Sequence, residues 1–551
     1  MILGIDIGGT HTDAVCVDRE GIRASAKAIT GDDLVASILE VIEELGIEYH
    51  DLRRVVLSTT LSTNTIIEKK YAPTGMIVSA GPGIDPRSYF LNGDFHLVRG
   101  AIDHRGREYV PVDRTQVLSV AAALKERGVR GVGVVSKFSV RNPQHETQIR
   151  ALIEGEFPYL SMGHSLSGKL AFPRRINTTY FNTAVMPVQE RFVGSVKKAL
   201  GALGITTPLL FLKADGGTFS SEAADRLPVE TILSGPAASM MGSVALCRDR
   251  GATTIVLDVG GTTTDIGVLV GGLPLLEPKG VIIDDLKTLV RGLKVVPVGA
   301  GGDSAVSLDG GVIRVGPHRD GPPVCLGGRV PTPMDAFCML GGFPGGDAAR
   351  ACTAVQGLCE PLARGSEEVS REIITTMAQN IRRAADAFID DVNAHPVYTI
   401  YEMLHPEVVT PRQVMLIGGP ATLLKPYIEE AFGLPCIVPP HAMVANALGA
   451  ALARTTGEIT LLADTQLRRL VCPELGMEQQ ISPTLTMEEL KDIGIKALAD
   501  RAEFLGLSDS YEISILEELS FNMVRGFSTT GKNLRLKMQT RPGILEDWSV
   551  Q

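Results

Sequence analysis

Two segments far apart in the chain share one pattern of aspartate, glycine and threonine. Residues 6–13 are DIGGTHTD and residues 258–265 are DVGGTTTD. In each, a glycine pair follows an apolar run, so backbone N–H groups can approach an anion without obstruction by a Cβ atom, and the following threonines add hydroxyl donors. Phosphate suits such a loop. A single copy is typical of an ordinary hairpin, whereas two matched copies indicate phosphate binding.

The acidic and loop residues of these two segments are the candidate site. Asp6 and Asp258 each end an apolar run, where a carboxylate can hold Mg²⁺ through water or orient an attacking group, and Asp265 ends the second copy. We predict that all three are catalytic and that Asp6 and Asp258 are the metal ligands. The predicted phosphate-binding residues are Gly8, Gly9, Thr10, Thr12, Gly260, Gly261, Thr262 and Thr263.

The elements that must position the first segment form a mixed α/β pattern. Closely spaced apolar runs at the start predict an antiparallel meander, after which strands and helices alternate. The predicted elements are strands at 2–7, 13–17, 22–28, 55–58 and 75–79, and helices at 34–45 and 61–69. Residues 255–270 repeat residues 2–17 in register, which indicates two related domains that face each other.

The rest of the chain continues the α/β pattern until about residue 456. The predicted strands lie at 132–135, 208–212 and 414–417, and the predicted helices at 187–200, 237–247, 366–390, 421–432 and 445–453. Residues 299–347 are rich in glycine and proline and predict long loops. Beyond 456 the chain is polar and partly helical, with a predicted hairpin around 528–531.

Composition excludes several classes of protein. The chain has 551 residues, 44% hydrophobic and 21% charged, so it is not mainly disordered. Its net charge of −10, without a run of Lys or Arg, argues against nucleic-acid and anionic-membrane partners. No secretion signal follows Met1 and no apolar run reaches about 18 residues, so we expect a cytoplasmic protein. The eight cysteines form no CxxC pair and predict reduced, mostly buried side chains.

Five segments, in this order, resemble the nucleotide motifs of the actin, hexokinase and heat-shock chaperone ATPase superfamily. The resemblance makes residues 6–13 and 258–265 the two phosphate loops, with SGPA at 234–237 beginning the first connecting helix. Gly418, Gly419 and Pro420 would form the adenosine motif. The small residues of ANALGAALA at 445–453 would let a second connecting helix cross the first closely in the cleft between two lobes.

Within that superfamily, further strings resemble the hydantoinase A/oxoprolinase family. They are GGTHTD at 8–13, STTLSTNTIIE at 58–68, NPQHE at 142–146, ADGGTFS at 214–220, SGPAAS at 234–239, DVGGTTTD at 258–265, VGAGGDS at 298–304 and the glycine–proline segment at 315–341. The resemblance covers residues 1 to about 455. We add Gly301 and Gly302 of VGAGGDS to the predicted nucleotide-binding residues.

The resemblance implies an α/β fold with two actin-like lobes, built from duplicated ribonuclease H-like domains, with a glycine/proline-rich insertion and a C-terminal α+β extension. We assign residues 1–185 to the first lobe, 186–455 to the second lobe and 456–551 to the extension. The two phosphate loops would then lie on different lobes and bind one triphosphate between them.

The family's chemistry implies an ATP- and Mg²⁺-dependent hydrolase of cyclic amides such as hydantoin, N-methylhydantoin or 5-oxoproline. Phosphorylation of the ring carbonyl oxygen would prepare the ring for attack by water, often with a hydantoinase B type partner subunit. A homo-oligomer also stays open. Two alternatives remain: an ATP-driven enzyme-reactivating or chaperone-like ATPase, and a small-molecule kinase.

The sequence departs from the family pattern on the substrate side. Phe172-Pro173-Arg174-Arg175 replaces a string with two acids, although Arg175 and Asn182 are kept. His318 and Arg319 stand where an acid and a small residue are usual. No nucleophile triad or zinc spacing offers a separate hydrolytic site, so we expect efficient ring opening to need a partner, docked through residues 456–551.

Other polar residues have both a structural and a functional interpretation. A histidine at a helix start, like His145 in NPQHE, is more often structural than a ligand, and Lys137 is more often solvated than bound to phosphate. Functional roles stay open for a further set: His11, Glu146, Asp303, and the polar group Thr59, Thr60, Thr63 and Asn64 near a helix N-terminus.

Overall fold

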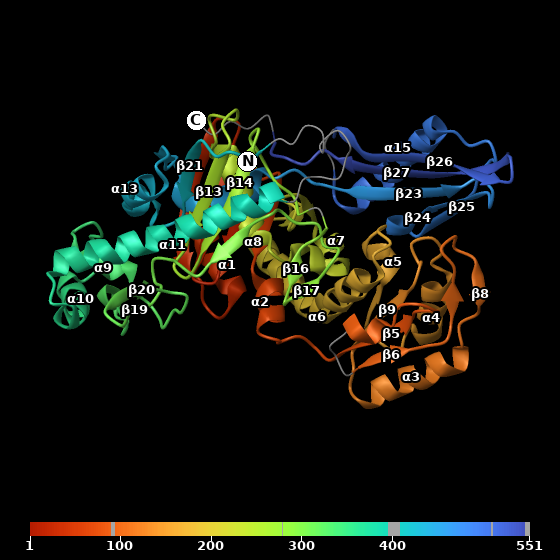
Figure 1. Cartoon of the computed structure of the whole chain (residues 1–551), viewed down its shortest axis with the longest axis horizontal. Coiled ribbons are helices and arrows are strands. Elements are labelled where there is room, and N and C mark those ends of the chain that lie inside the picture. The colour runs from red at the N-terminus through yellow and green to blue at the C-terminus, as the bar shows by residue number, and fades with distance from the viewer. Residues whose placement is uncertain (90–93, 278, 395–407, 508–510, 546–551) are drawn as a thin grey trace.

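The computed structural model describes residues 1–89, 94–277, 279–394, 408–507 and 511–545. Two sheets with related topology form the centre of the molecule (Figure 1). In spatial order, the strands of the first sheet are β3 (Gly21–Ile29), β2 (His11–Asp18), β1 (Ile2–Ile7), β4 (Arg54–Thr59), β11 (Leu209–Leu212) and β12 (Thr218–Ser220). The second sheet runs β15 (Leu273–Pro274), β14 (Thr264–Val270), β13 (Thr254–Val259), β21 (Gln413–Ile417) and β22 (Cys436–Ile437), with β18 (Val296–Val298) beside β14.

The central strands of the two sheets repeat one pairing pattern. In each, a central strand pairs with an antiparallel hairpin partner on one side and with a parallel strand on the other. Asp6 pairs in register with Asp13, and Asp258 with Asp265, at equivalent places in the two sheets. The predicted two-lobed actin-like fold, built from duplicated ribonuclease H-like domains, is confirmed.

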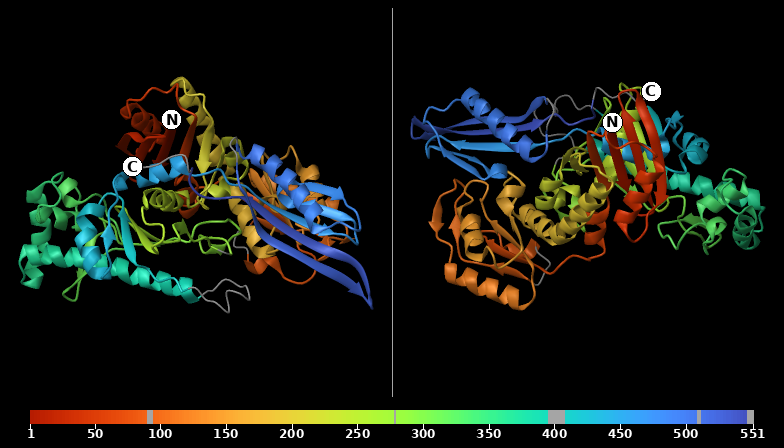
Figure 2. Two further views of the ribbon diagram at one scale, coloured as in Figure 1. Left: turned by 90° about the horizontal axis from the view of Figure 1, so that it is seen from above. Right: turned by 180° about the vertical axis from the view of Figure 1, so that it is seen from behind.

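Two helices lie between the sheets: α8 (Ser234–Leu246) and α14 (Ala445–Leu452) (Figure 2, left). The two helices cross closely at one glycine of each, Gly242 of α8 and Gly449 of α14. A Cβ atom on Gly449 would lie 2.1 Å from the carbonyl oxygen of Ala238, and one on Gly242 would lie 2.0 Å from that of Ala445. The prediction that small residues allow this close crossing is confirmed, and both helices join one apolar core with strands of both sheets.

The outer faces of the sheets are covered by other helices. α1 (Leu34–Glu44) and the C-terminal half of α6 (Phe172–Ala202) pack on the first sheet. On the second sheet lie α9 (Pro333–Met339), α10 (Ala348–Leu362), α11 (Ser366–Ala394) and α13 (Ala421–Phe432). The glycine/proline-rich segment holds one short hairpin, β19 (Val306–Asp309) and β20 (Val312–Val315), before α9.

The helix that we expected to begin at Pro187 begins at Phe172. Eighteen of its 31 residues are buried, and this packing outweighs the cost of an interior proline, about 3 kcal/mol. The first sheet also continues past the boundary that we set at residue 185, because β11 and β12 are its edge strands. That boundary is wrong: it falls inside α6, and residues 209–220 belong with the first sheet.

Residues 74–162 include a separate parallel sheet that the sequence analysis merged with the first lobe. Its order is β10 (Tyr159–Met162), β9 (Gly131–Ser136), β5 (Thr74–Ser79) and β6 (Phe95–Leu97), flanked by α3 (Arg114–Glu126) and α4 (Gln144–Ile153). This insertion domain is the orange unit in Figure 1.

The C-terminal extension is an α+β domain, as predicted. Helix α15 (Met487–Phe504) packs on one face of a five-stranded sheet. The sheet's strands, in spatial order, are β25 (Met477–Gln480), β24 (Arg469–Cys472), β23 (Glu458–Asp464), β27 (Ser528–Thr540) and β26 (Ile513–Arg525). The β26–β27 hairpin is present, but it turns at residues 526–527, just before the residues that we had predicted.

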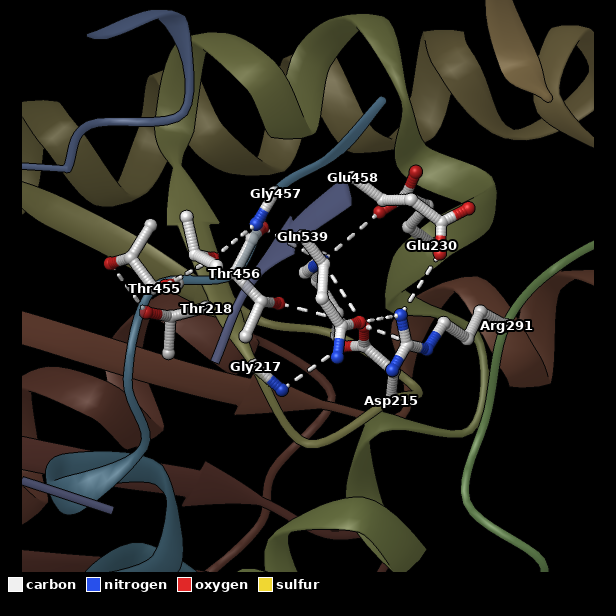
Figure 3. Close-up of polar contacts among 12 residues, drawn as sticks. Asp215, Gly217, Thr218, Glu230, Arg291, Thr455, Thr456, Gly457, Glu458 and Gln539 are labelled. Atoms are coloured by element: carbon white, nitrogen blue, oxygen red, sulfur yellow. Dashed lines mark hydrogen bonds and ion pairs between the residues drawn. The ribbon is translucent and has the colours of Figure 1, made fainter. Parts of the chain in front are cut away.

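A cluster of charged residues joins both lobes to the extension (Figure 3). Arg291, from the second lobe, lies with Nη1 3.0 Å from Glu458 Oε2 and with Nε 3.9 Å from Asp215 Oδ2. Arg291 also donates to Gln539 on β27. Lys213, beside the β11–β12 turn, lies 3.4 Å from Asp215. We call these five residues the junction cluster; Lys213, Asp215 and Gln539 are buried, whereas Arg291 and Glu458 are partly exposed.

Candidate functional site

The two phosphate loops are the same turn built twice. The N–H of Gly8 donates to the carbonyl oxygen of His11 at 3.0 Å, and the N–H of Gly260 donates to that of Thr263 at 2.9 Å. Gly8, Gly260 and the Thr263 carbonyl therefore serve to close the turns. Gly9 lies in open surroundings, where an added Cβ would meet nothing within 4 Å.

The loops come from different lobes and face one shared space. The guanidinium Nη1 of Arg319 lies 3.2 Å from Thr10 Oγ1 and 3.4 Å from Thr262 Oγ1. One side chain thus spans both threonines, so Thr10 and Thr262 face the same space, and their role as phosphate donors stays a prediction. Thr12 is different, because it is fully buried and its hydroxyl bonds to Thr30 Oγ1 at 3.0 Å.

The carboxylate of Asp258 lies among three other aspartates. Burial raises the pKa values of Asp6, Asp13 and Asp265, and the charge of Asp258 adds to the rise in each. Asp258 itself is fixed by both connecting helices, since Oδ2 accepts hydrogen bonds from Ser239 Oγ at 2.5 Å and from Asn446 Nδ2 at 3.2 Å. The helices between the lobes therefore hold the central acid of the cleft.

Two of the predicted catalytic acids have pKa values near neutrality. Burial, with smaller contributions from Asp13 and Asp258, raises the pKa of Asp6 to about 7, although Ser58 and Asn446 favour its charged form. Burial and then Asp258 raise the pKa of Asp265 to about 7. Carboxyl groups of this kind can exchange a proton at neutral pH.

The acids fit a hydrated magnesium ion. Oδ1 of Asp6 is buried and accepts no hydrogen bond from the described residues, and the surrounding carboxylates repel one another. Among those residues, no three His, Cys, Asp or Glu side chains are arranged to hold a metal alone. Mg²⁺ commonly binds through one or two carboxylates, with water and phosphate completing its shell, which suits Asp6 and Asp258.

The glycine loop at 299–304 packs directly on the second phosphate loop. The N–H of Gly302 donates to the Gly260 carbonyl at 3.0 Å, and that of Asp303 donates to Gly261. A Cβ on Gly301 would lie 2.5 Å from the Gly261 oxygen, so only glycine fits there. Gly301 and Gly302 thus pack against the backbone of the second phosphate loop and support it.

The predicted adenosine motif also lies against this loop. Gly418 follows β21 with φ +92°, and a Cβ there would lie 2.3 Å from the Val259 oxygen and 2.8 Å from Asp258 Oδ1. Gly419 has open surroundings, and Pro420 precedes the first turn of α13. The structure therefore gathers the second loop, the glycine loop and this motif around Asp258.

Several other candidates lie in the insertion domain, away from the cleft. His145 is fully buried, with Nε2 2.9 Å from Glu108 and Nδ1 3.3 Å from Ser79. Glu146 Oε2 accepts from His164 Nδ1 at 2.6 Å. Burial opposes its charge, but His164 and Arg175 lower the pKa of Glu146 overall. These contacts fasten the domain's strands and helices together.

The two arginines of the altered segment at 172–175 make structural contacts. Arg175 is fully buried and donates to the carbonyl oxygens of Lys169 and Ser136 at 2.9 and 3.0 Å. Arg174 donates to Thr288 O at 3.1 Å. Lys137 donates to the carbonyl oxygen of Pro82 at 2.7 Å.

The polar residues at 59–64 lie beside the start of α8. Thr63 Oγ1 accepts from the N–H of Leu233 at 3.0 Å, and Ser234 Oγ donates to the Thr59 carbonyl at 2.9 Å. Asn64 Nδ2 donates to Thr60 Oγ1 at 3.3 Å. They join the first sheet to the first connecting helix.

Sequence reasoning missed three polar groups of the cleft. Ser239 and Asn446, which hold Asp258, stand inside helices that the sequence marks only for small residues. Arg319 is marked only as a departure from the family pattern, because nothing local predicts that its loop folds back over both phosphate loops.

Comparison with known families gives two matches. The family described as hydantoinase/oxoprolinase matches residues 175–459, and its N-terminal region matches residues 2–157.

About a quarter of the aligned residues are identical between the chain and its curated relatives. The caprolactamase subunit alpha of Pseudomonas jessenii is 26% identical, over 90% of this chain and 76% of that protein. The acetophenone carboxylase gamma subunit of Aromatoleum aromaticum is 27% identical, over 62% of this chain and 53% of that protein. The 5-oxoprolinase of Saccharomyces cerevisiae is 24% identical, over 62% and 31%. The chain thus spans about half of the second relative and a third of the last.

Two solved structures have the same fold. The ATP-dependent caprolactamase from Pseudomonas jessenii matches with a TM-score of 0.73 at 20% identity, over 100% of this chain and 88% of that one. Nucleotide-free acetone carboxylase matches with a TM-score of 0.71 at 19% identity, over 99% and 88%. No helix in the described ranges is both long and apolar enough to span a bilayer.

Proposed function

Because the chain belongs to the hydantoinase/oxoprolinase family, we propose that it uses ATP to activate a cyclic amide for ring opening. The observation that carries this proposal is the pair of phosphate loops, facing each other across four coupled aspartates. Relatives named ATP-dependent caprolactamase and 5-oxoprolinase support the reaction class.

Phosphorylation would overcome the low reactivity of the amide carbon toward water. Amide resonance puts electron density on the carbonyl oxygen and protects the carbon from water. In our proposal that oxygen attacks the γ-phosphorus, an O–P bond forms, and the bond to the bridging oxygen of ADP breaks. Water can then attack the activated carbon, and the ring C–N bond breaks as the nitrogen takes up a proton. The acyl phosphate that results is hydrolysed by a second water, which breaks the bond to the phosphoryl group and releases phosphate and the opened acid.

The chain's own residues would position this transfer and stabilise its charge. Thr10 and Thr262 offer hydroxyl donors from opposite lobes, and Asp258 is fixed by Ser239 and Asn446. Asp6 and Asp258 would hold Mg²⁺, which would neutralise phosphate charge. Asp265, with a pKa of about 7, is suited to accept a proton near the transferring group.

Product stoichiometry tests the proposal. The protein would be incubated with Mg-ATP and a panel of hydantoins, 5-oxoproline and larger lactams, with ADP, phosphate and opened acid measured together. Equal amounts of the three products are expected. A stable phosphorylated product would instead identify a kinase, and turnover stimulated by another protein without ring opening would identify a reactivating ATPase.

A separate subunit is the second part of the proposal. Relatives carry subunit names, alpha for caprolactamase and beta for acetone carboxylase. We place a hydantoinase B type subunit at β26, the edge strand of the C-terminal sheet. Its free edge carries apolar side chains that remain exposed, at Leu519, Phe521 and Val524. Exposed apolar edges are sites for pairing with another chain.

Co-purification tests this placement. Phe521→Ser with Val524→Ser should weaken the capture of a co-expressed hydantoinase B type subunit at least tenfold, while ATP turnover by the isolated chain stays unchanged. Leu118→Ser, at a half-exposed apolar position on α3, is the control. Efficient ring opening by the chain alone would remove the need for a partner, and dimers lost in the double variant would assign β26 to a second copy instead.

A further inference from the structure

Arg319 projects from the loop after β20 into the space between the phosphate loops. Its three guanidinium nitrogens have different partners. Nε donates to the Gly321 carbonyl at 3.2 Å, Nη2 lies 2.9 Å from Asp303 Oδ2, and Nη1 contacts the hydroxyls of Thr10 and Thr262. The first two contacts fix the plane of the group, and the third directs it at both loops.

The surroundings of this guanidinium leave it partly accessible. A quarter of its side chain is exposed, against 14% for Asp303. His11 lies close by: burial first, and then Lys27 and Arg319, lower its pKa, so the neutral ring adds little positive charge. A backbone hydrogen bond holds the loop that carries Arg319 in place, because the Ala305 N–H donates to the His318 carbonyl at 2.7 Å.

A phosphate chain held by both loops would have to meet Nη1. The two threonine hydroxyls in contact with Nη1 are neutral and weak acceptors, whereas phosphoryl oxygens are charged and match a planar guanidinium bidentately. Charge-assisted bonds of this kind are about twice as strong as neutral ones. Exchange of hydroxyls for phosphoryl oxygens is therefore favourable without any movement of the Asp303 and Gly321 contacts.

We propose that Arg319 is a catalytic residue that binds the transferring phosphoryl group, and that Asp303 is its positioning residue. This inference rests on the proposed use of ATP but not on the identity of the cyclic amide. An arginine supplied by the chain itself stabilises negative charge on the equatorial phosphoryl oxygens as the bond to ADP breaks. It also connects the lobes, because the second-lobe loop reaches Thr10 on the first.

The test compares Arg319→Ala, Arg319→Lys and Asp303→Asn with wild type. The control is Arg314→Ala, an exposed arginine that pairs with Asp309 on the same loop region. Affinities for the β,γ-imido analogue of ATP and for ADP are measured by calorimetry, and ATP turnover by ADP release. Circular dichroism and melting temperature show whether each variant is folded.

Arg319→Ala should lower kcat by about 1,000-fold or more, the low end of what a transition-state arginine contributes. It should weaken the ATP analogue at least tenfold and ADP less than threefold, and added guanidinium should restore part of the turnover. Arg319→Lys should stay low because an ammonium cannot form the bidentate contact. Asp303→Asn should lower kcat with ADP affinity unchanged, and Asp303→Glu should recover part of it.

Two results would overturn the inference. A folded Arg319→Ala variant with wild-type turnover and affinities would remove Arg319 from the mechanism. An Arg319→Ala variant that binds ATP more tightly than wild type would show that the arginine competes with phosphate for the site. Wild-type protein that hydrolyses ATP but opens no ring would defeat the proposed substrate alone. Wild-type protein without ATP affinity would defeat both.

Discussion

Asp258 interacts with the polar groups around it through two kinds of contact, charge repulsion and hydrogen bonds. Three aspartates respond to its charge, and two helices donate to it. The sequence could identify Asp258 because it stands in a repeated motif. It could not identify Asn446 or Ser239, because their role depends on how two distant helices cross.

Removal of either carboxylate that we propose to bind metal should lower ATP turnover without unfolding the protein. Asp6→Asn and Asp258→Asn each remove charge without changing side-chain size, so ATP turnover should fall by two or more orders of magnitude while the circular dichroism spectrum is unchanged. Wild-type turnover in a folded variant would exclude that aspartate. Asp18→Asn, at an exposed ion pair with Arg23, is the control.

The raised pKa of Asp6 predicts a specific dependence of stability on pH. Its folded pKa of about 7 lies above its ordinary 3.8, so the folded protein binds this proton more tightly. The resulting stability is fully present below about pH 4 and is lost as pH rises to about 7. Asp6→Asn, which cannot ionise, should therefore exceed wild type in free energy of unfolding at pH 8, by up to about 1.4 kcal/mol per unit of pKa shift.

Denaturant titrations at pH 5 and pH 8 would check this expectation. The advantage of Asp6→Asn should be larger at pH 8. An advantage that is equal at both pH values would mean that Asp6 is charged throughout this range. Asp18→Asn should show no gain at pH 8, because desolvation opposes the charge of Asp18 but hydrogen bonds from Arg23 and from backbone N–H groups lower its pKa overall.

At the scale of elements, the crossing of α8 and α14 shows what a sequence pattern can predict. Short runs of small residues predicted close helices, and the crossing occurs at Gly242 and Gly449. The repeated β-hairpins were equally predictable, because each is local. The insertion domain was not, since its sheet pairs β5 with β9 across more than fifty residues, and parallel pairing leaves no local turn to detect.

A methyl group at the crossing should be costly. Gly449→Ala would place Cβ about 2.1 Å from a backbone oxygen, so the helices must separate, and the free energy of unfolding should fall by about 2 kcal/mol or more. Gly194→Ala on α6, where an added Cβ meets nothing within 4 Å, should instead gain about 0.5–1 kcal/mol. Equal effects of the two substitutions on chemical denaturation would argue that the crossing tolerates separation.

At the scale of the whole molecule, the site is divided between two bodies. Thr10 belongs to the first lobe, and Thr262 and Arg319 to the second, so one phosphate chain can be held only if the lobes keep a set distance. Sequence analysis predicted this division from the duplication alone. The distribution of the remaining domains could not follow from motifs, because the insertion and the extension carry none of the repeated pattern.

Nucleotide should therefore draw the lobes together. Mg-ATP in excess should raise the melting temperature, by the usual linkage of ligand binding to folding, and should reduce the radius of gyration in solution scattering. Arg314→Ala should behave as wild type in both measurements. Scattering profiles that coincide with and without saturating Mg-ATP would exclude closure.

The junction cluster holds one end of β27, so a movement at the cluster would become larger at the distant tip of the β26–β27 hairpin. Gln539 lies at the cluster, bonded to Arg291 of the second lobe, and β27 runs from there to the tip at residue 528. Eleven residues of strand span roughly 36 Å at about 3.3 Å each. Arg291 and Asp215 come from different lobes, so a change in the angle between lobes acts on the end of β27 at the cluster. A rotation of roughly 10° there would displace the distant tip by about 6 Å.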